Sequence, residues 1–454
     1  MAPTRPVGQN RIMTTVDFFQ DNYAPVREEL TALDLDVTGT IPDALDGRLL
    51  RIGPNPVNDP KPTDHWFTGS GMAHGLRLSG GEALWYRNRY INGDGVADTL
   101  GRPRMPGPRH MDSDGGANTN IIGHAGKTYA IVEGFNYPVE LTDELESVTT
   151  STFDGTLDGT FTAHPKRHPG TGELHAVNYF FGWEDHVRYV VVGTDGKVRR
   201  QVDVPTGHSP MIHDCSVTES AVLILDFPVH FSMEAAMAGS SLPYRWDPDA
   251  VCRIGVLPFD APGDAVQWCE LDPCFAFHAL NSFDRPDGTI QLDIAKHAKM
   301  FDTVTNGPAE GPPNLYRWIL DPAKGTVTEE QLDDRNQEFP RIDERMIGQD
   351  AQFGYTVGFV GEEGPAYKRD LRSNTTERHD FGEGRSSQEM VFVPRSPDAD
   401  EDDGWCLSYV HDANTNTADV VILNAQDFSG EPQAIVHLPQ RVPYGFHSNW
   451  VASE

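Results

Sequence analysis

The stretch "VPYGFHSNW" (442–450) gives the end of this sequence an unusually ordered pattern. Pro443 and Gly445 bend the chain, and aromatic residues flank a single histidine, His447. Chain termini usually fray unless contacts tie them down. In a closed ring of β-sheets, the last strand pairs near the first and is held in place. The stretch therefore favours a closed β architecture.

The rest of the sequence agrees with this reading. Its 454 residues exceed one ordinary hydrophobic core, which indicates several domains or one large closed fold. A total of 43 Gly and 34 Pro separate short β-rich runs such as "AVLILDFPV" (221–229) and "ADVVILNAQ" (418–426). A propeller is the economical arrangement of so many short strands. We expect one all-β propeller domain over residues 1–454.

Charge and composition exclude several functions. The net charge of -32 argues against nucleic acid or an anionic membrane surface as a partner. The longest apolar runs have the length of strands, and the first residues contain no apolar signal region. The five cysteines form no CxxC pair, which favours a reducing compartment. We therefore expect a cytoplasmic protein.

Four of the 17 histidines stand at the edges of apolar or aromatic stretches: His164, His213, His278 and His447. They are separated by 49, 65 and 169 residues, or about one, one and two to three blades if seven blades average about 65 residues each. Equivalent inner strands would then direct four imidazoles at one axis. Taken alone, each histidine is more simply explained as a core residue whose hydrogen bonds are satisfied. Imidazole suits Zn, Cu, Fe or Ni, and the spacing does not choose among them.

Ten sequence blocks in order resemble those of the carotenoid cleavage oxygenase family, which includes stilbene-cleaving dioxygenases. The likeness runs nearly from end to end. The blocks are "RIGPNP" (51–56), "HWFTGSGMAHGLRL" (65–78), "YRNRYI" (86–91), "GANTNI" (116–121), "TAHPKRHPGTGELHAVNY" (162–179), "MIHDCSVTES" (211–220), "FHALNSFD" (277–284), "EFPRID" (338–343), "QEMVFVPR" (388–395) and "VPYGFHSNW" (442–450).

This resemblance implies a seven-bladed β-propeller with a cap of helices and loops over an axial metal site. It implies that His164, His213, His278 and His447 hold a non-haem Fe(II) ion. Metal-ligating histidines usually pass their other N–H to a carboxylate or carbonyl. The family supplies three glutamates for this purpose, and they match Glu133, Glu338 and Glu389.

The implied activity is oxidative cleavage of an electron-rich C=C bond by O2, giving two carbonyl products. Thr119 matches a threonine that crowds an open iron position in the family. The first hypothesis is a dioxygenase acting on an apocarotenoid or similar apolar polyene. The alternative is a stilbenoid or phenylpropanoid alkene. A third reading is an isomerase, or a propeller that binds a ligand without turnover.

The substrate is the least specified feature. Stilbene-cleaving relatives hold a phenol oxygen with a tyrosine and a lysine, which match Tyr90 and Val132. Valine in place of lysine removes the ammonium group and favours an apolar substrate. Phe67, Tyr90 and Phe283 are predicted to line the substrate tunnel. The mildly apolar segment 227–246 predicts at most weak, transient membrane contact.

Overall fold

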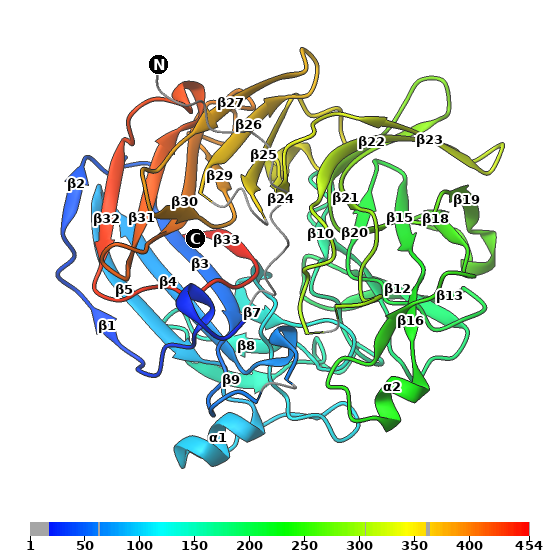
Figure 1. Cartoon of the computed structure of the whole chain (residues 1–454), viewed down its shortest axis with the longest axis horizontal. Coiled ribbons are helices and arrows are strands. Elements are labelled where there is room, and N and C mark those ends of the chain that lie inside the picture. The colour runs from blue at the N-terminus through cyan, green and yellow to red at the C-terminus, as the bar shows by residue number, and fades with distance from the viewer. Residues whose placement is uncertain (1–17, 62–63, 305, 360–363, 454) are drawn as a thin grey trace, which may run out of the picture.

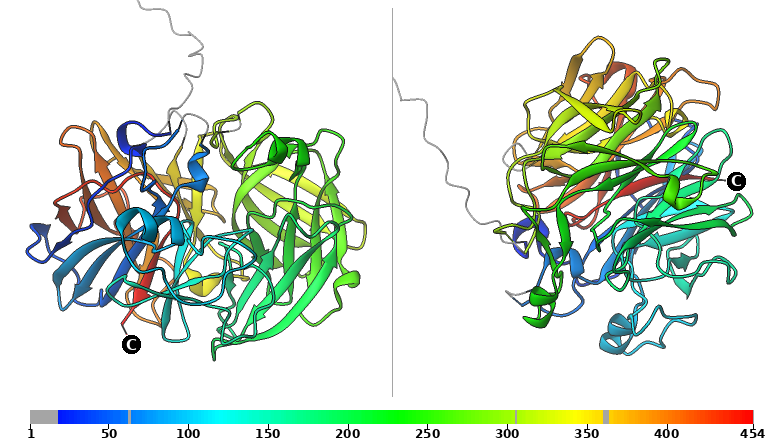
Figure 2. Two further views of the ribbon diagram at one scale, coloured as in Figure 1. Left: turned by 90° about the horizontal axis from the view of Figure 1, so that it is seen from below. Right: turned by 90° about the vertical axis from the view of Figure 1, so that its right-hand side faces the viewer.

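The computed structural model describes residues 18–61, 64–304, 306–359 and 364–453. Its antiparallel sheets follow one another around a ring in chain order (Figure 1). Strands make up the body of the molecule, and the short helices lie at its surface (Figure 2). The predicted all-β, propeller-like fold is confirmed.

The first sheet contains both the early strands and the last one. Its order is β1 (Thr31–Ala32), β5 (Glu82–Tyr90), β4 (Gly71–Ser79), β3 (Gly47–Pro54) and β33 (Ser448–Ala452). Arg51 of β3 pairs with Ser448 of β33, so the stretch 442–450 closes the ring as expected. The turn from β4 to β5 carries Gly80 and Gly81 at φ 57° and 77°, the left-handed values that a tight hairpin requires.

Four further sheets complete the ring together with an eight-stranded one. Two of these sheets contain β6 (Asn120–His124), β7 (Lys127–Ile131), β8 (Val139–Leu141) and β9 (Ser147–Thr150), and then β10 (Lys166–Arg167), β11 (Leu174–Asn178), β12 (His186–Val192) and β13 (Val198–Pro205). The third contains β24 (Gln337–Arg341), β25 (Phe353–Gly358), β26 (Ala366–Asp370) and β27 (Thr375–His379). The last contains β2 (Val37–Gly39), β32 (Ala434–Leu438), β31 (Thr417–Asn424), β30 (Gly404–Asp412) and β28 (Arg385–Ser387), and β29 (Val391–Pro394) also pairs with β30.

The eight-stranded sheet corrects the predicted number of blades. One half contains β14 (Cys215–Val217), β15 (Ala221–Asp226), β18 (Cys252–Pro258) and β19 (Gln267–Leu271). The other half contains β23 (Thr326–Gln331), β22 (Asn314–Asp321), β21 (Ile290–His297) and β20 (Phe275–Asp284). A single parallel pair, Glu270 with Thr326, joins them into one sheet. The described strands therefore do not form seven separate blades, and that prediction is wrong.

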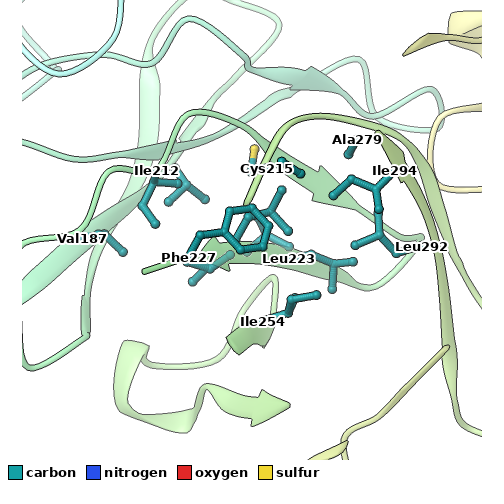
Figure 3. Packing of buried hydrophobic residues seen from close by; sticks show 14 of the residues in the cluster. Val187, Ile212, Cys215, Leu223, Phe227, Ile254, Ala279, Leu292 and Ile294 are labelled. Atoms are coloured by element: carbon teal, nitrogen blue, oxygen red, sulfur yellow. The ribbon is translucent and has the colours of Figure 1, made fainter. Parts of the chain in front are cut away.

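The largest apolar core lies within and beside this sheet. Every residue of β15 is buried, as expected for a strand covered on both faces by neighbouring sheets. Phe227 and Leu223 pack there with Ile254, Leu292 and Ile294 (Figure 3). This packing anchors the strand ends from which the histidines project.

The predicted helical cap is reduced to loops and short helices. Within the described ranges, the two α-helices are α1 (Asp94–Leu100) and α2 (Met233–Met237). The 3-10 turns are Asp21–Tyr23, Trp66–Thr68, Gly263–Ala265, Glu344–Met346 and Ala425–Asp427. Helix α2 lies between β16 (Val229–Phe231) and β17 (Tyr244–Trp246), which pair as a hairpin. Frequent Gly and Pro explain why longer helices do not form.

Candidate metal centre

The structure brings the four predicted histidines together. The nitrogen atoms that His164, His213, His278 and His447 can offer a metal all lie within 4.8 Å of one another, and all four residues are buried. His164, His213 and His447 precede β10, β14 and β33 by one or two residues, and His278 lies within β20. The four side chains thus come from separate parts of the ring and meet at one point.

Each predicted glutamate contacts one of these histidines through Nδ1. The distances are 2.8 Å from His213 to Glu133, 2.7 Å from His278 to Glu338 and 3.0 Å from His447 to Glu389. An ionised carboxylate only accepts hydrogen bonds, so Nδ1 must carry the proton in each pair. In a neutral imidazole this leaves Nε2 with a free lone pair. The three carboxylates therefore fix the tautomer that a metal requires.

Two of these lone pairs face each other. Nε2 of His213 lies 3.2 Å from Nε2 of His278. Nε2 of His164 is buried and has no hydrogen-bond partner among the residues that the structure describes. Unshared lone pairs at such distances repel unless a cation lies between them. The donor set therefore fits a divalent transition metal such as iron.

The surrounding charges keep the glutamates ionised. Burial alone would raise the pKa of Glu338, but the imidazoles of His278 and His297 bring it well below its ordinary value. Burial also opposes ionisation of Glu389, yet Arg341 and His447 lower its pKa to about 2. Burial lowers the pKa of His447 to about 4 despite the Glu389 carboxylate. An ionised Glu338, an ionised Glu389 and a neutral His447 are states that favour binding of a metal cation.

Backbone irregularities aim these side chains at the centre. The pairing of β20 with β21 shifts register around His278, between Ala276 and Asn281. Strand β24 has a similar shift between Glu338 and Arg341, and Phe339 there has φ 52°. Bulges of this kind redirect side chains and are common next to active sites. No simple alternation along the sequence predicts them.

Three residues beside the centre were not predicted. Arg341 contacts Glu389 Oε1 at 3.2 Å and donates to the carbonyl of Ser448 at 2.8 Å. Arg51 is buried and donates to the carbonyl of Phe446 at 3.1 Å. His297 Nε2 lies 3.7 Å from Glu338 Oε1. Arg51 and Arg341 lie inside the blocks "RIGPNP" and "EFPRID", so the family resemblance could have indicated both residues. No sequence feature distinguishes His297 from the other histidines.

An apolar cavity of about 730 Å³ opens on one side of the centre. His213, His278 and His447 form part of its wall. The aromatic and aliphatic residues of the wall include Trp66, Phe67, Val132, Phe277, Phe339 and Phe446. The ring of Phe67 lies 5.9 Å from that of Phe277 and 5.3 Å from that of Phe446. Two predicted substrate residues, Phe67 and Val132, thus line this cavity.

Thr119 also lies in this wall, next to His447. Its carbonyl accepts a hydrogen bond from the backbone N–H of His447 at 3.3 Å. Its hydroxyl donates to Oδ1 of Asn118 at 2.8 Å. The structure therefore places Thr119 in the cavity wall beside His447.

Tyr90 and Phe283 do not belong to this wall. The Tyr90 hydroxyl contacts Asn55 Nδ2 at 2.8 Å and the Val26 carbonyl at 3.2 Å. Phe283 is five residues beyond His278 on β20, or about 16 Å at 3.3 Å per residue. The structure therefore does not bring these two residues into the wall of the apolar cavity, because the direction of β20 takes Phe283 away from it and local hydrogen bonds hold Tyr90.

A second, polar cavity of about 800 Å³ meets the centre at His164, His278 and His447. Its charged lining residues are Arg48, Arg77, Lys127, Asp143, Glu144, Lys166, Arg167, Asp214, Arg341, Glu344 and Glu389. Many are paired, as Lys166 is with Asp214 at 2.8 Å. The sequence analysis did not predict this cavity.

The segment 227–246 forms β16, α2 and β17 beside the apolar cavity. Phe231, Leu242 and Tyr244 contribute to the cavity wall, whereas Met233 and Met237 are 63% and 83% exposed. Across the described part of the chain, no helix combines the length and the apolar character needed to cross a membrane.

Comparisons with known proteins identify the family. The family model described as RPE65, retinal pigment epithelial membrane protein, matches residues 23–452. The chain is 41% identical to the carotenoid cleavage oxygenase of Mycobacterium tuberculosis, over 95% of this chain and 97% of that protein. It is 31% identical to carotenoid 9,10(9',10')-cleavage dioxygenase 1 of Pisum sativum, over 95% and 89%.

A solved structure agrees with this relationship. The lignostilbene dioxygenase of Pseudomonas brassicacearum matches with a TM-score of 0.86 and 26% identity, over 97% of this chain and 99% of that one. The family match, the two relatives and the shared fold all extend over nearly the whole sequence. The chain therefore belongs to the RPE65 family, that of the carotenoid cleavage oxygenases.

Proposed function

We propose that this protein is a non-haem Fe(II) dioxygenase that cleaves a C=C bond of an apocarotenoid or similar apolar polyene. The observation that carries the proposal is the convergence of four imidazoles, three of which, His213, His278 and His447, also lie in the wall of an apolar cavity. The relatives named as carotenoid-cleaving oxygenases and dioxygenases support the reaction class. The products would be two carbonyl compounds.

The four histidines His164, His213, His278 and His447 would hold the ion. When bound, Fe(II) supplies the redox chemistry by which O2 is reduced and its atoms pass to the two alkene carbons. Glu133, Glu338 and Glu389 keep the Nδ1 protons in place, so the Nε2 lone pairs stay directed inward.

The remaining wall residues would bind and orient the alkene. Phe67, Val132, Phe277 and Phe339 offer apolar surface beside the histidines and exclude water from them. Thr119 holds the His447 backbone through its carbonyl, and its side chain would limit the space at that side of the centre. Holding the double bond in a fixed geometry next to the centre is the contribution of these residues.

A stilbenoid or phenylpropanoid alkene is the alternative substrate, favoured by the likeness to a lignostilbene dioxygenase structure. The cavity argues for the polyene. Arg51 is the one arginine or lysine among the described residues of the apolar wall, and its Nη1 donates to the Phe446 carbonyl at 3.1 Å. Val132 provides no ammonium, and the Tyr90 hydroxyl bonds elsewhere. A bound phenolate would thus lack the lysine and tyrosine that hold it in stilbene-cleaving relatives.

We also propose a single domain and a reducing, cytoplasmic location. The pairing of β3 with β33 supports one domain over residues 1–454, because it closes the ring between distant parts of the sequence. Five buried cysteines without disulfides support a reducing compartment: Cys215, Cys252, Cys269, Cys274 and Cys406. The exposed Met233 and Met237 support weak, transient membrane contact beside the cavity.

The test is reconstitution of the purified protein with Fe(II), followed by turnover with an apocarotenal and, in parallel, a 4-hydroxystilbene. Both run under 18O2, with products identified by mass spectrometry. We expect paired carbonyl products from the apocarotenal, each carrying label, and loss of iron and products in His213→Ala. The control is His186→Ala, a histidine beside Asp185 and outside both cavities.

The other outcomes discriminate among the alternatives. Faster cleavage of the hydroxystilbene would replace the polyene by the stilbenoid reading. An isomerised product without label would replace the dioxygenase by an isomerase. Failure of the wild type to bind iron would contradict the four-histidine centre itself.

A further inference from the structure

A second group of metal-ligating side chains lies outside the four-histidine centre. His208, Asp226 and His230 offer ligand atoms that all lie within 4.8 Å of one another. They come from three segments: the loop after β13, the end of β15 and the middle of β16. They share no residue with the proposed iron centre, and the proposed reaction makes no use of them.

The two imidazoles are arranged like a ligand pair. Their ring centroids lie 4.2 Å apart, close to the 4.5 Å between His164 and His213 in the main centre. Nε2 of His208 lies 2.9 Å from Oδ1 of Asp226. Nε2 of His230 is buried and has no hydrogen-bond partner among the described residues. A buried polar atom without a partner is costly, and a bound ion would satisfy it.

Asp226 is held in the orientation of a metal-ligating carboxylate. Its side chain is fully buried, and its Oδ2 accepts a hydrogen bond from Arg253 Nε at 2.8 Å. Arg253 is itself fixed, because it donates to the Thr206 carbonyl at 2.6 Å and lies 4.0 Å from the ring of Trp268. Oδ1 therefore remains directed at the histidines. Ligating carboxylates are commonly held by such an outer partner.

The charges around the group leave room for a dication. The charged groups that contact it are Asp226, Arg253 and Asp247, whose Oδ2 lies 3.5 Å from Nδ1 of His230. Two carboxylates balance one guanidinium with a negative charge to spare, so binding of a cation is favourable.

We propose that His208, Asp226 and His230 bind a divalent transition-metal ion of the Zn²⁺ type, with water or Asp247 in the fourth position. Two imidazoles and a carboxylate suit this class of ion. The ion would tie the β16–β17 hairpin to β15. Because Phe231 and Tyr244 of this hairpin line the apolar cavity, the ion would fix one part of that wall.

The experiment counts metal ions in four matched proteins: the wild type, His230→Ala, His213→Ala and the double variant. Each is stripped with chelator, loaded with Co²⁺ as a spectroscopic substitute for Zn²⁺, desalted and analysed for metal. We expect about two ions in the wild type, one in each single variant and none in the double variant. His437→Ala, whose imidazole contacts Asp419 and Thr38 outside both groups of ligands, is the control and should bind like the wild type.

His230→Ala binding as much metal as the wild type would overturn the proposal. His208→Gln, which keeps most of the side-chain volume, provides a second test if His230→Ala does not fold. A protein that loses its ion in His230→Ala but not in His213→Ala would support this site while contradicting the four-histidine centre. Added Zn²⁺ should also raise the Tm of His213→Ala and leave that of the double variant unchanged.

Discussion

Two cavities meet at the four-histidine centre, and they differ in almost every physical respect. The apolar cavity is walled by aromatic rings such as Phe67 and Phe277. The polar cavity is walled by charged side chains such as Lys166 and Asp214, many of them paired. His278 and His447 belong to both walls. An apolar alkene gains free energy only on the first side, so the difference assigns substrate binding to one cavity.

The polar cavity has a structural explanation. Lys166 and Asp214 flank the histidine segments, and Asp214 also accepts hydrogen bonds from the backbone of Cys215 and Ala279. These bonds connect the segment before β14 to β20, which carries His278. The charged side thus positions the histidines, and the aromatic side holds the substrate. Five substitutions test this division, from the largest expected effect to the smallest.

His447→Ala removes a donor that both cavities share. We expect iron to fall from about one ion per chain to background and alkene cleavage to be lost. Metal analysis and product formation measure the effect, with His437→Ala as the control. A variant that keeps the wild-type iron content and activity would show that His447 is not a metal ligand.

Glu338→Gln weakens the bond that orients His278. Loss of such an outer partner typically costs about 10–100-fold in metal affinity or activity. We expect a reduction of this size in Fe(II) affinity, measured by competition with a chelator. Glu140→Gln, which alters an acid paired with Lys127 outside the centre, should bind iron like the wild type.

Val132→Lys places a charge in the apolar wall. Burying an unpaired ammonium is unfavourable, so we expect kcat/KM for an apocarotenal to fall about 10–100-fold with iron content unchanged. The ratio of hydroxystilbene to apocarotenal cleavage should rise, because an ammonium favours a phenolate. Val132→Leu is the matched control, and equal losses in both variants would contradict an electrostatic cause.

Lys166→Met changes the polar side instead. It leaves Asp214, which is 1% exposed, without its cationic partner. We expect the free energy of unfolding to fall by about 1–3 kcal/mol, the usual cost of an unsatisfied buried group. In denaturant unfolding this loss should appear while KM for the apocarotenal stays near the wild-type value. A large rise in KM without loss of stability would assign substrate binding to the polar cavity.

Tyr90→Phe should have the smallest effect. It removes the hydroxyl that contacts Asn55 and the Val26 carbonyl, outside the apolar wall. We expect a loss of about 1 kcal/mol in the free energy of unfolding and unchanged kcat and KM for both substrates. A selective loss of hydroxystilbene turnover would restore Tyr90 as a substrate residue.

The sequence predicted those residues of the metal centre that stand in distinctive short stretches. His447 in "YGFHSNW" and Glu389 in "QEMVFVP" stand out because a polar residue interrupts an apolar pattern. Their meeting through a 3.0 Å contact is a property of the closed ring. The β-rich runs are a similar case. Their composition predicts that strands form, but not which strands pair in a sheet.

The features that were missed depend on register and direction. Phe283 shares a sequence block with His278, yet the strand carries it toward the other end of the sheet. The single pair of Glu270 with Thr326 joins two groups of strands that composition alone presents as separate blades. His297 reaches Glu338 only because β21 ends beside β24, which no local pattern records.

The pairing of Arg51 in β3 with Ser448 in β33 also has a consequence for folding. These residues are 397 apart in the chain, and His447 stands directly before the closing strand. Bringing such distant segments together is slow and entropically costly. An ion that needs His447 binds only after the ring has closed, so its binding free energy adds to that of closure. The metal would therefore stabilise the closed ring in addition to its part in the reaction. Its removal by a chelator would shift the equilibrium toward a ring in which β3 and β33 are separated.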